Sequence, residues 1–326
     1  MRVGRIVSLL VAAMTTFMSG TSFAREAPKN IALSTGSTLA TWTIPGIAAP
    51  SVKSHLTPVI FLHGGPGMYT EDRRLDMGQA FRAAGFTTIY YDQIGGGQSA
   101  RIPATNYNLA RMIADLEALR VSLGAEKMVL WGNSWGSQLA ILYAQAYPTR
   151  VAGFVLTSPG GFPGENFRRD YSPTKRTNVT IGRDLSSAIR QIDRKGGAAE
   201  PAVSQINSGL LMDQLVSAEM LEGMVCKTSD IAQAPLPGGS NLFVNRIVAN
   251  EVERARPNWT SVPRVPTAIL RGACDFIPVA SANRYAAITG GTVLTLANVG
   301  HGLIEDPTSL NAALTVFIRE GLANLP

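Results

Sequence analysis

The chain has 326 residues, of which 45% are hydrophobic, and 29 basic against 23 acidic residues give it a net charge of +6. The length allows one large core or a core with an inserted piece, and the composition excludes a disordered or collagen-like chain. Its pairs of adjacent arginines, Arg73-Arg74 and Arg168-Arg169, belong to no basic stripe with interleaved aromatic residues. Nucleic acid is therefore not an expected partner.

Residues 1–24 have the pattern of a targeting segment. Arg2 and Arg5 precede a short apolar run, and Ser22-Phe23-Ala24 ends it with small residues at the first and third places. We predict a secretory signal peptide here, and hence a periplasmic or secreted mature protein with a charge of +4 once both arginines are removed. The alternative is an uncleaved membrane anchor. Threonines and serines interrupt the run, so no stable membrane span is expected after cleavage.

Short apolar runs alternate with helical patterns along the rest of the chain. The expected strands are residues 41–44, 58–62, 86–91, 128–130, 151–156, 266–272 and 293–296, and the expected helices are 108–123 and 310–322. Nearly continuous apolar strands that alternate with helices predict an α/β fold with a mostly parallel central sheet covered by helices. The loops at 63–67, 92–99 and 132–136 each follow a strand, so we expect them to meet at one edge of the sheet.

Residues 160–262 differ in character from the flanking regions. Pro, Gly, Arg and Asn become more frequent, no strong strand pattern occurs, and helical spacing appears around 185–192, 210–215 and 244–248. We predict a mainly helical cap inserted at 160–262 between two parts of one core, residues 25–159 and 263–326.

The two cysteines, Cys226 and Cys274, leave two alternatives open. In an oxidising compartment they can form a disulfide, and otherwise they remain two buried thiols. The chain has no zinc-type spacing of cysteine and histidine, and its three histidines lie far apart in sequence. No metal or cofactor is expected.

A serine stands between two glycines at a strand-to-helix corner, in Gly132-Asn133-Ser134-Trp135-Gly136. A side chain at such a corner projects out of the sheet, and small residues two positions away let neighbouring backbone approach. The N-terminus of the following helix favours developing negative charge. Ser134 is therefore the predicted nucleophile, and the alternative is a glycine-rich turn with an incidental serine.

A serine nucleophile needs a base within hydrogen-bond reach, and that base needs an orienting acid. His301 follows the last expected strand and is the predicted base, with a surface-loop histidine as the alternative reading. Asp275 follows the preceding strand and is the predicted acid, although a turn aspartate there could instead cap the next helix. The order Ser134, Asp275, His301 is the order found in α/β-hydrolases.

The predicted oxyanion hole needs two N–H donors aimed at the developing charge. One is the backbone N–H of Trp135, and the other comes from Gly64 or Gly65 in the HGGPG loop, where glycine lets the backbone approach a substrate. His63 begins this loop, and its place there favours a structural role over that of the base.

These motifs together resemble one family. HGGPG at 63–67, DQIGGGQS at 92–99, GNSWG at 132–136, GACD at 272–275 and GHG at 300–302 are similar to the motifs of the proline iminopeptidases, which have the α/β-hydrolase fold with an inserted helical cap. The resemblance implies a serine hydrolase that works through an acyl-enzyme and releases small N-terminal residues, often proline, from short peptides.

Two departures from the family pattern keep other substrates open. Ile94 stands where the family usually carries arginine, and Gly239 falls near the place of a glutamate that binds the substrate's free amine. The acids available in the cap to replace that glutamate are Glu165, Asp213, Glu219, Glu222, Glu251 and Glu253, although most are expected to be solvated. The alternative function is a carboxylesterase or lactonase, and a remoter one is a non-catalytic binding protein on a hydrolase scaffold.

Overall fold

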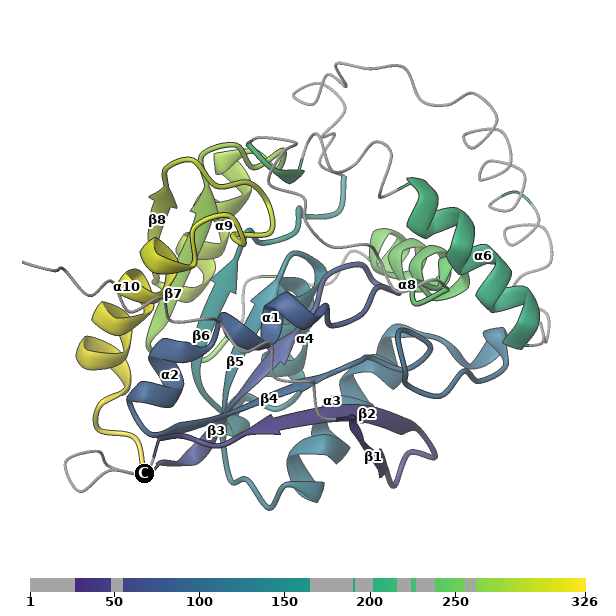
Figure 1. The fold of residues 1–326 in the computed structure, drawn as a ribbon, viewed down its shortest axis with the longest axis horizontal. Helices are drawn as coiled ribbons and strands as arrows, with labels where there is room; N and C mark the ends of the chain where they lie inside the picture. Colours follow the sequence, from purple (N-terminus) through teal and green to yellow (C-terminus); the bar gives the residue numbers. More distant parts are fainter. Residues whose placement is uncertain are drawn as a thin grey trace, which may run out of the picture.

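The computed structural model describes residues 27–47, 55–164, 190, 202–215, 224–226, 238–255, 259 and 262–326. Its described strands form one eight-stranded sheet in the order β1-β2-β4-β3-β5-β6-β7-β8 (Figure 1). They are β1 (Lys29–Ala32), β2 (Thr38–Ile44), β3 (His55–Leu62), β4 (Phe86–Tyr91), β5 (Met128–Asn133), β6 (Val151–Thr157), β7 (Thr267–Gly272) and β8 (Thr292–Leu296). β2 pairs antiparallel with β1 and β4, and the described strands from β4 to β8 pair in parallel. The mostly parallel sheet predicted from the sequence is confirmed.

Helices cover both faces of this sheet. The described helices are α1 (Asp72–Asp76), α2 (Gln79–Ala83), α3 (Leu109–Ser122), α4 (Trp135–Ala146), α6 (Ala202–Leu215), α8 (Leu242–Ala255), α9 (Val279–Thr289) and α10 (Pro307–Phe317), with shorter turns at Ala104–Asn106, Pro148–Arg150 and Ile318–Leu322. In β3, Ile60 and Leu62 belong to the apolar cluster under α3, α4 and α9, whereas Val59 and Phe61 belong to the cluster under α2 and α10. Successive strand residues face opposite sides, and both sides are buried, so the strands are continuously apolar in sequence.

The sequence patterns predicted the described strands from β2 to β8, but neither β1 nor the helices α1, α2 and α9. β1 is mostly exposed, and α1 and α2 have five residues each, so none of them carries a clear apolar period. The predicted helix at 310–322 begins earlier, because Pro307 occupies its first turn and the Asp306 side chain accepts a hydrogen bond from Ser309 N–H. A π-helical turn over Ile318–Leu322 follows it.

Two described helices, α6 and α8, lie within the predicted cap and contact each other. Asn241, just before α8, donates from its backbone N to Gly67 O at 2.7 Å and from Nδ2 to Gly95 O at 2.9 Å. Asn245 Nδ2 donates to Pro66 O at 2.9 Å. These bonds hold α8 against the loops that follow β3 and β4. The helical pattern predicted around 185–192 lies outside the described residues except for residue 190, and the boundaries at 160 and 262 stay predictions.

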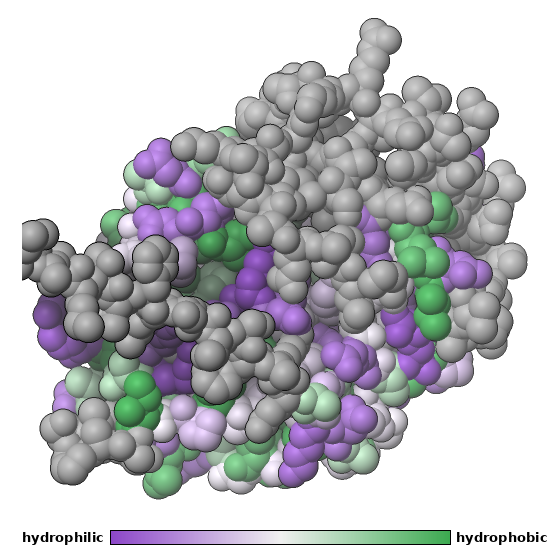
Figure 2. Space-filling view, in the orientation of Figure 1, coloured by the Kyte–Doolittle hydropathy of each residue, from purple (hydrophilic) through white to green (hydrophobic). Residues whose placement is uncertain are grey.

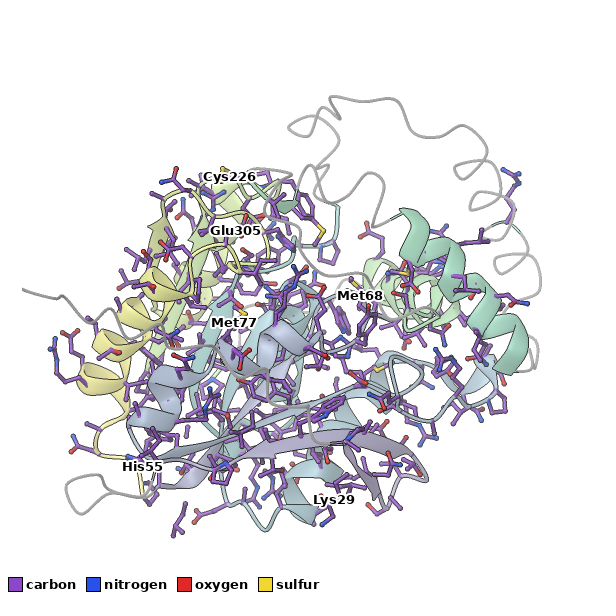
Figure 3. All side chains as sticks on the ribbon, in the orientation of Figure 1. Lys29, His55, Met68, Met77, Cys226 and Glu305 are labelled. Atoms are coloured by element: carbon purple, nitrogen blue, oxygen red, sulfur yellow. A yellow bond between two sulfur atoms is a disulfide. The ribbon has the colours of Figure 1, made fainter. Side chains whose placement is uncertain are left out.

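Cys226 and Cys274 are joined in a disulfide, with 5.3 Å between their Cα atoms. Cys226 N–H donates to Glu305 Oε1 at 3.1 Å, and the two residues lie at the same end of the molecule (Figure 3). The bond ties the segment 224–226 to the loop between β7 and α9, which carries Asp275. Of the two alternatives for the cysteines, the structure has the disulfide.

The described surface carries hydrophobic residues scattered among hydrophilic ones, as the face drawn in Figure 2 illustrates. In the described part of the chain, no helix has the length and apolar character required to cross a bilayer.

Candidate active site

Ser134 lies at the corner between β5 and α4 with φ 53° and ψ −119°, a conformation that residues other than glycine rarely adopt. Its N–H donates to Thr157 O of β6 at 3.0 Å, and its carbonyl accepts from Gly160 N–H at 3.0 Å. These two bonds hold the strained turn, which directs the serine side chain out of the sheet.

Glycines two positions on either side of Ser134 allow this corner to close. A Cβ at Gly136 would overlap the backbone carbonyl of Leu62 in β3, and a Cβ at Gly132 would overlap the backbone of Gly136 and Ser137. The sequence spacing of the two glycines therefore follows from the close approach of three backbone segments.

His301 and Asp275 form a buried pair behind Ser134. His301 Nδ1 lies 2.8 Å from Asp275 Oδ1, which also accepts a hydrogen bond from Ile277 N–H at 2.9 Å. Burial by itself raises the pKa of Asp275, but the charge and hydrogen bond of His301 outweigh it, and the pKa lies below its ordinary value. Asp275 is therefore an ionised carboxylate that fixes the proton of His301 on Nδ1 and leaves Nε2 as the basic nitrogen.

Ser134 and His301 line the same cavity of about 380 Å³. No hydrogen bond joins the Ser134 hydroxyl to the His301 ring in the described structure. Such contacts are often long in a site without substrate and shorten in the reacting complex. The structure thus brings the three residues predicted from separate motifs into one site, with the Asp275–His301 contact already formed.

His63 is buried and both of its ring nitrogens are used by backbone groups. Gln93 N–H donates to Nε2 at 2.9 Å, so the proton is on Nδ1, which donates to Gly64 O at 2.8 Å. Burial lowers the pKa of His63 from 6.5 to about 4; the bond to Gly64 opposes this and the charge of Arg74 adds to it. His63 is neutral at pH 7 and serves as a structural link within the loop.

Gln93 connects the two segments that carry the predicted oxyanion donors. Its Nε2 donates to His63 O at 3.0 Å, and its Oε1 accepts from the indole Nε1–H of Trp135 at 2.9 Å. Both side chains are buried. In the sequence Gln93 is only one residue of the DQIGGGQS motif, and a single sequence does not reveal which loops its amide joins.

The backbone N–H groups of Gly64, Gly65 and Trp135 donate to no other described residue. Since a peptide unit is planar and trans, the His63 bond that holds Gly64 C=O directs the N–H of Gly65 to the opposite side. The Cα of Gly64 lies against the side chain of Ser134. Unpaired donors thus lie on two segments next to Ser134, the HGGPG loop and the start of α4.

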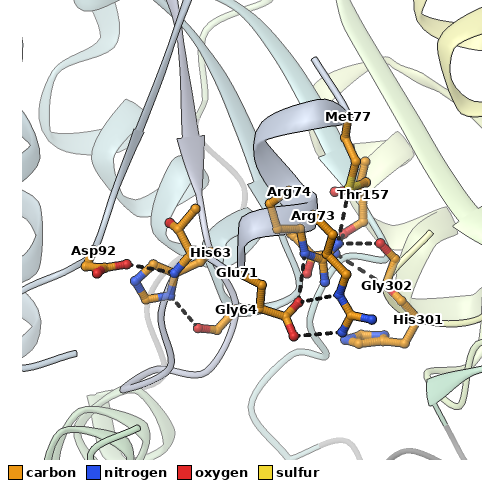
Figure 4. A network of polar contacts seen from close by, with 12 residues as sticks. His63, Gly64, Glu71, Arg73, Arg74, Met77, Asp92, Thr157, His301 and Gly302 are labelled. Atoms are coloured by element: carbon orange, nitrogen blue, oxygen red, sulfur yellow. Dashed lines mark hydrogen bonds and ion pairs between the residues drawn. The ribbon is translucent and has the colours of Figure 1, made fainter. Parts of the chain in front are cut away.

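A charged network forms one wall of the cavity (Figure 4). Glu71 accepts hydrogen bonds from Arg73 Nη2 at 2.7 Å and from Arg73 Nε at 3.2 Å. Arg74 Nε lies 3.3 Å from Glu71 Oε2. Arg74 is buried and also donates to Gly302 O, beside His301. The sequence marks Arg73-Arg74 only as a basic pair, six residues beyond the end of the HGGPG loop.

A second hollow of about 290 Å³ also reaches Ser134 and Trp135. Among its lining residues are Gly160, Phe162 and Glu253, whose carboxylate accepts from Gly164 N–H at 3.0 Å. Other described cap acids are engaged elsewhere: Asp213 accepts from Gly238 N–H and Glu251 from Leu109 N–H. The cap acids Glu165, Glu219 and Glu222 lie outside the described residues.

A search of the described residues finds no group of three or more His, Cys, Asp or Glu side chains placed to hold a metal ion.

Comparison with known proteins agrees with this geometry. Residues 57–196 match the family model described as the alpha/beta hydrolase fold. A probable proline iminopeptidase of Leptolyngbya boryana is 25% identical over 272 residues, which cover 76% of this chain and 82% of that protein. A probable proline iminopeptidase of Streptomyces coelicolor is 40% identical over 109 residues, which cover 32% of this chain and 33% of that protein.

Among solved structures, an esterase from Thermogutta terrifontis superposes with a TM-score of 0.62 and 20% sequence identity, covering 90% of this chain and 99% of that one. At this identity the likeness establishes the fold alone.

Proposed function

We propose that this chain, which has the α/β-hydrolase fold and resembles the proline iminopeptidases, is a serine hydrolase that releases N-terminal residues from short peptides through an acyl-enzyme. The observation that carries the proposal is the Asp275–His301 pair in the same cavity as Ser134, on its strained strand-to-helix corner. A non-catalytic binding protein has no need of all three residues, Ser134, Asp275 and His301.

In the proposed reaction Ser134 Oγ attacks the scissile carbonyl while His301 Nε2 takes its proton. His301 then gives this proton to the leaving group, and water deacylates the enzyme by the same route. Asp275 keeps the ring in the correct tautomer and stabilises the imidazolium. The N–H of Trp135 and the N–H of Gly65 or Gly64 stabilise the oxyanion. Gly65 is the better placed of the two glycines, because His63 orients its peptide unit.

Peptide cleavage leads over ester cleavage for two reasons. The similarity to probable proline iminopeptidases extends over most of this chain. In addition, Glu253 provides a carboxylate in the hollow at Ser134, although Gly239 lies near the usual place of the amine-binding glutamate. A carboxylesterase or lactonase remains the second candidate, favoured by the same Gly239.

We also propose that the signal peptide at 1–24 directs export and is removed. The disulfide between Cys226 and Cys274 supports this proposal, because disulfides form and persist in oxidising compartments.

The test of the proposed function compares prolyl-2-naphthylamide, its N-acetylated form and a short-chain nitrophenyl ester. We expect turnover of the free amine, loss of that turnover on acetylation, and loss of all activity in Ser134→Ala, by at least about 10³-fold. The matched control is Ser122→Ala on α3, an exposed serine that lines neither hollow at Ser134 and should retain full activity.

Ester turnover alone, abolished in Ser134→Ala, would replace the peptidase by an esterase or lactonase. Undiminished activity in a folded Ser134→Ala variant would contradict the serine mechanism itself.

A further inference from the structure

The cavity at Ser134 has one feature that the proposed acyl transfer does not use. Most of its lining surface is apolar, with contributions from Phe61 and Phe276, but the charged side chains of Arg73, Arg74 and Glu71 also line it. A few polar groups in a mainly apolar cavity set which substrate binds and how it is oriented.

Hydrogen bonds to Glu71 fix the Arg73 guanidinium and leave part of it for a ligand. Nε and Nη2 donate to the two carboxylate oxygens, at 3.2 and 2.7 Å. Nη1 carries two further N–H groups, and no described residue accepts from them. Arginine is always charged and its planar fork matches a carboxylate, so the open nitrogen is a fitting anion donor.

Glu71 is less suited to bind a ligand cation. Its Oε2 accepts a hydrogen bond from Arg73 Nε and lies 3.3 Å from Arg74 Nε. Its Oε1 accepts a hydrogen bond from Arg73 Nη2. Burial raises the pKa of Glu71, but the nearby arginines outweigh it and hold the pKa below its ordinary value. Glu71 is thus an ionised anchor shared by two arginines, and an amine would have to displace one of them.

The position of Arg73 places it on the side of the leaving group. The leaving group takes its proton from His301 and so lies next to that ring. Arg73 lines the same cavity as His301, and its neighbour Arg74 donates to Gly302 O (Figure 4). The second hollow at Ser134 is lined by neither Arg73 nor His301, which leaves it for the acyl group.

We propose that Arg73 binds a carboxylate on the leaving group. The substrates are then amides or esters whose leaving amine or alcohol also carries a carboxylate, as the second residue of a dipeptide does. This inference rests on the proposed serine hydrolase function. In the reaction the scissile C–N or C–O bond breaks, water supplies the new acyl oxygen, and the leaving atom takes the His301 proton. Arg73 changes no bond; it positions the leaving group and favours anionic over neutral ones.

The test uses 3-acetoxybenzoate and its uncharged methyl ester, methyl 3-acetoxybenzoate, which share the acetyl group and a phenolic leaving oxygen, and it measures release of the phenol. Because a charge-assisted hydrogen bond is about twice as strong as a neutral one, we expect kcat/KM of the wild type to favour the carboxylate at least about 10-fold. Arg73→Gln should abolish that preference mainly through KM, while it retains turnover of the methyl ester. The same ordering is expected for Pro-Ala over prolyl-alaninamide.

The matched control is Arg319→Gln. Arg319 is also paired with a glutamate, Glu320 at 3.2 Å, but both side chains are exposed, so neither ester should be affected. A measurement without any variant is inhibition of the wild type, in which benzoate should be at least about 10-fold stronger than benzamide.

Equal kcat/KM for the two esters, or a preference unchanged in Arg73→Gln, would overturn the role of Arg73 while the hydrolase itself stands. Absence of turnover of every ester and peptide by folded wild type would instead overturn the proposed function and this inference with it.

Discussion

Two hydrogen bonds of the Gln93 side chain join separate segments beside the candidate site. The side-chain amide of Gln93 donates to His63 O in the HGGPG loop and accepts from the Trp135 indole at the start of α4. The backbone N–H of Gln93 donates to His63 Nε2 and thereby fixes the tautomer of His63. The two segments that supply the proposed oxyanion donors are therefore held at a fixed separation by one residue that touches no substrate. Catalysis by preorganised donors depends on such positioning to within fractions of an ångström.

We predict that Gln93→Ala lowers kcat by about 10- to 100-fold with KM changed less than about 3-fold, because misplaced donors weaken only transition-state binding. The affinity for a trifluoromethyl ketone, which mimics the tetrahedral intermediate, should fall by the same factor as kcat. The free energy of unfolding should fall by about 2 kcal/mol, since two buried hydrogen bonds are lost.

Gln98→Ala provides the matched control, because Gln98 lies on the same loop with an exposed side chain. It should leave kcat, KM and inhibitor affinity unchanged. If Gln93→Ala lowers stability but leaves kcat intact, the residue is structural only.

At the scale of elements, the disulfide joins part of the predicted cap to the loop that holds Asp275. The segment 224–226 also accepts a hydrogen bond from the loop that carries His301, from His301 N–H to Met224 O at 2.8 Å. Asp275 and His301 are thus braced by one short segment that a covalent bond keeps in place.

We predict that reduction of this disulfide lowers both activity and stability. The bond closes a loop over a sequence separation of 48 residues, and the chain-entropy model gives about 4 kcal/mol for a loop of that length.

The mature chain should have the mass of residues 25–326 less two hydrogens, and reduction should lower the melting temperature and kcat together. The Cys226→Ala/Cys274→Ala variant should behave like the reduced wild type and be insensitive to reductant.

Two free thiols in the unfolded, unreduced protein, or unchanged kcat after complete reduction, would contradict this role of the bond. A mature chain that still begins at Met1 would contradict signal-peptide removal.

At the scale of the whole molecule, the strand order decides which loops meet. β4, β3 and β5 are neighbours in parallel, so the loops that carry Gln93, the HGGPG motif and Ser134 leave the same edge of the sheet. β6, β7 and β8 continue the sheet and bring Asp275 and His301 to that edge. Ligands bind at the carboxyl ends of parallel strands for this reason.

His63 makes the stability of the whole protein depend on pH. Burial lowers its pKa from 6.5 to about 4, so the unfolded chain takes up a proton in a range where the folded chain does not. The contribution of His63 to stability is complete above pH 6.5 and is lost as the pH falls towards 4. The difference between the unfolded and folded pKa values corresponds to on the order of 3 kcal/mol. Denaturant unfolding at pH 7, 5.5 and 4 measures it.

His63→Gln should remove this part of the acid sensitivity, because glutamine does not titrate, while His55→Gln at a second buried histidine should keep it. An identical pH dependence in wild type and His63→Gln would mean that other groups cause the acid sensitivity.

The sequence alone predicted the mostly parallel sheet and the residues Ser134, Asp275 and His301, because each depends on local pattern. Continuous apolar runs mark doubly covered strands, and a catalytic group directly after a strand is placed by that strand. The contacts of Gln93, His63 and Arg73 were not predictable in this way. Each of them depends on which distant backbone or side-chain group faces it, and spacing along the chain carries no such information.

The sequence by itself thus determined most of the strands, their alternation with helices and the type of chemistry that three loops can carry. Only the tertiary structure decided that Cys226 pairs with Cys274, that the Gln93 amide links the loops of His63 and Trp135, and that an arginine lines the same cavity as His301. The physical reason is that apolar periodicity acts over a few residues, whereas pairing, hydrogen-bond partners and the lining of a cavity arise from segments that meet when the sheet assembles.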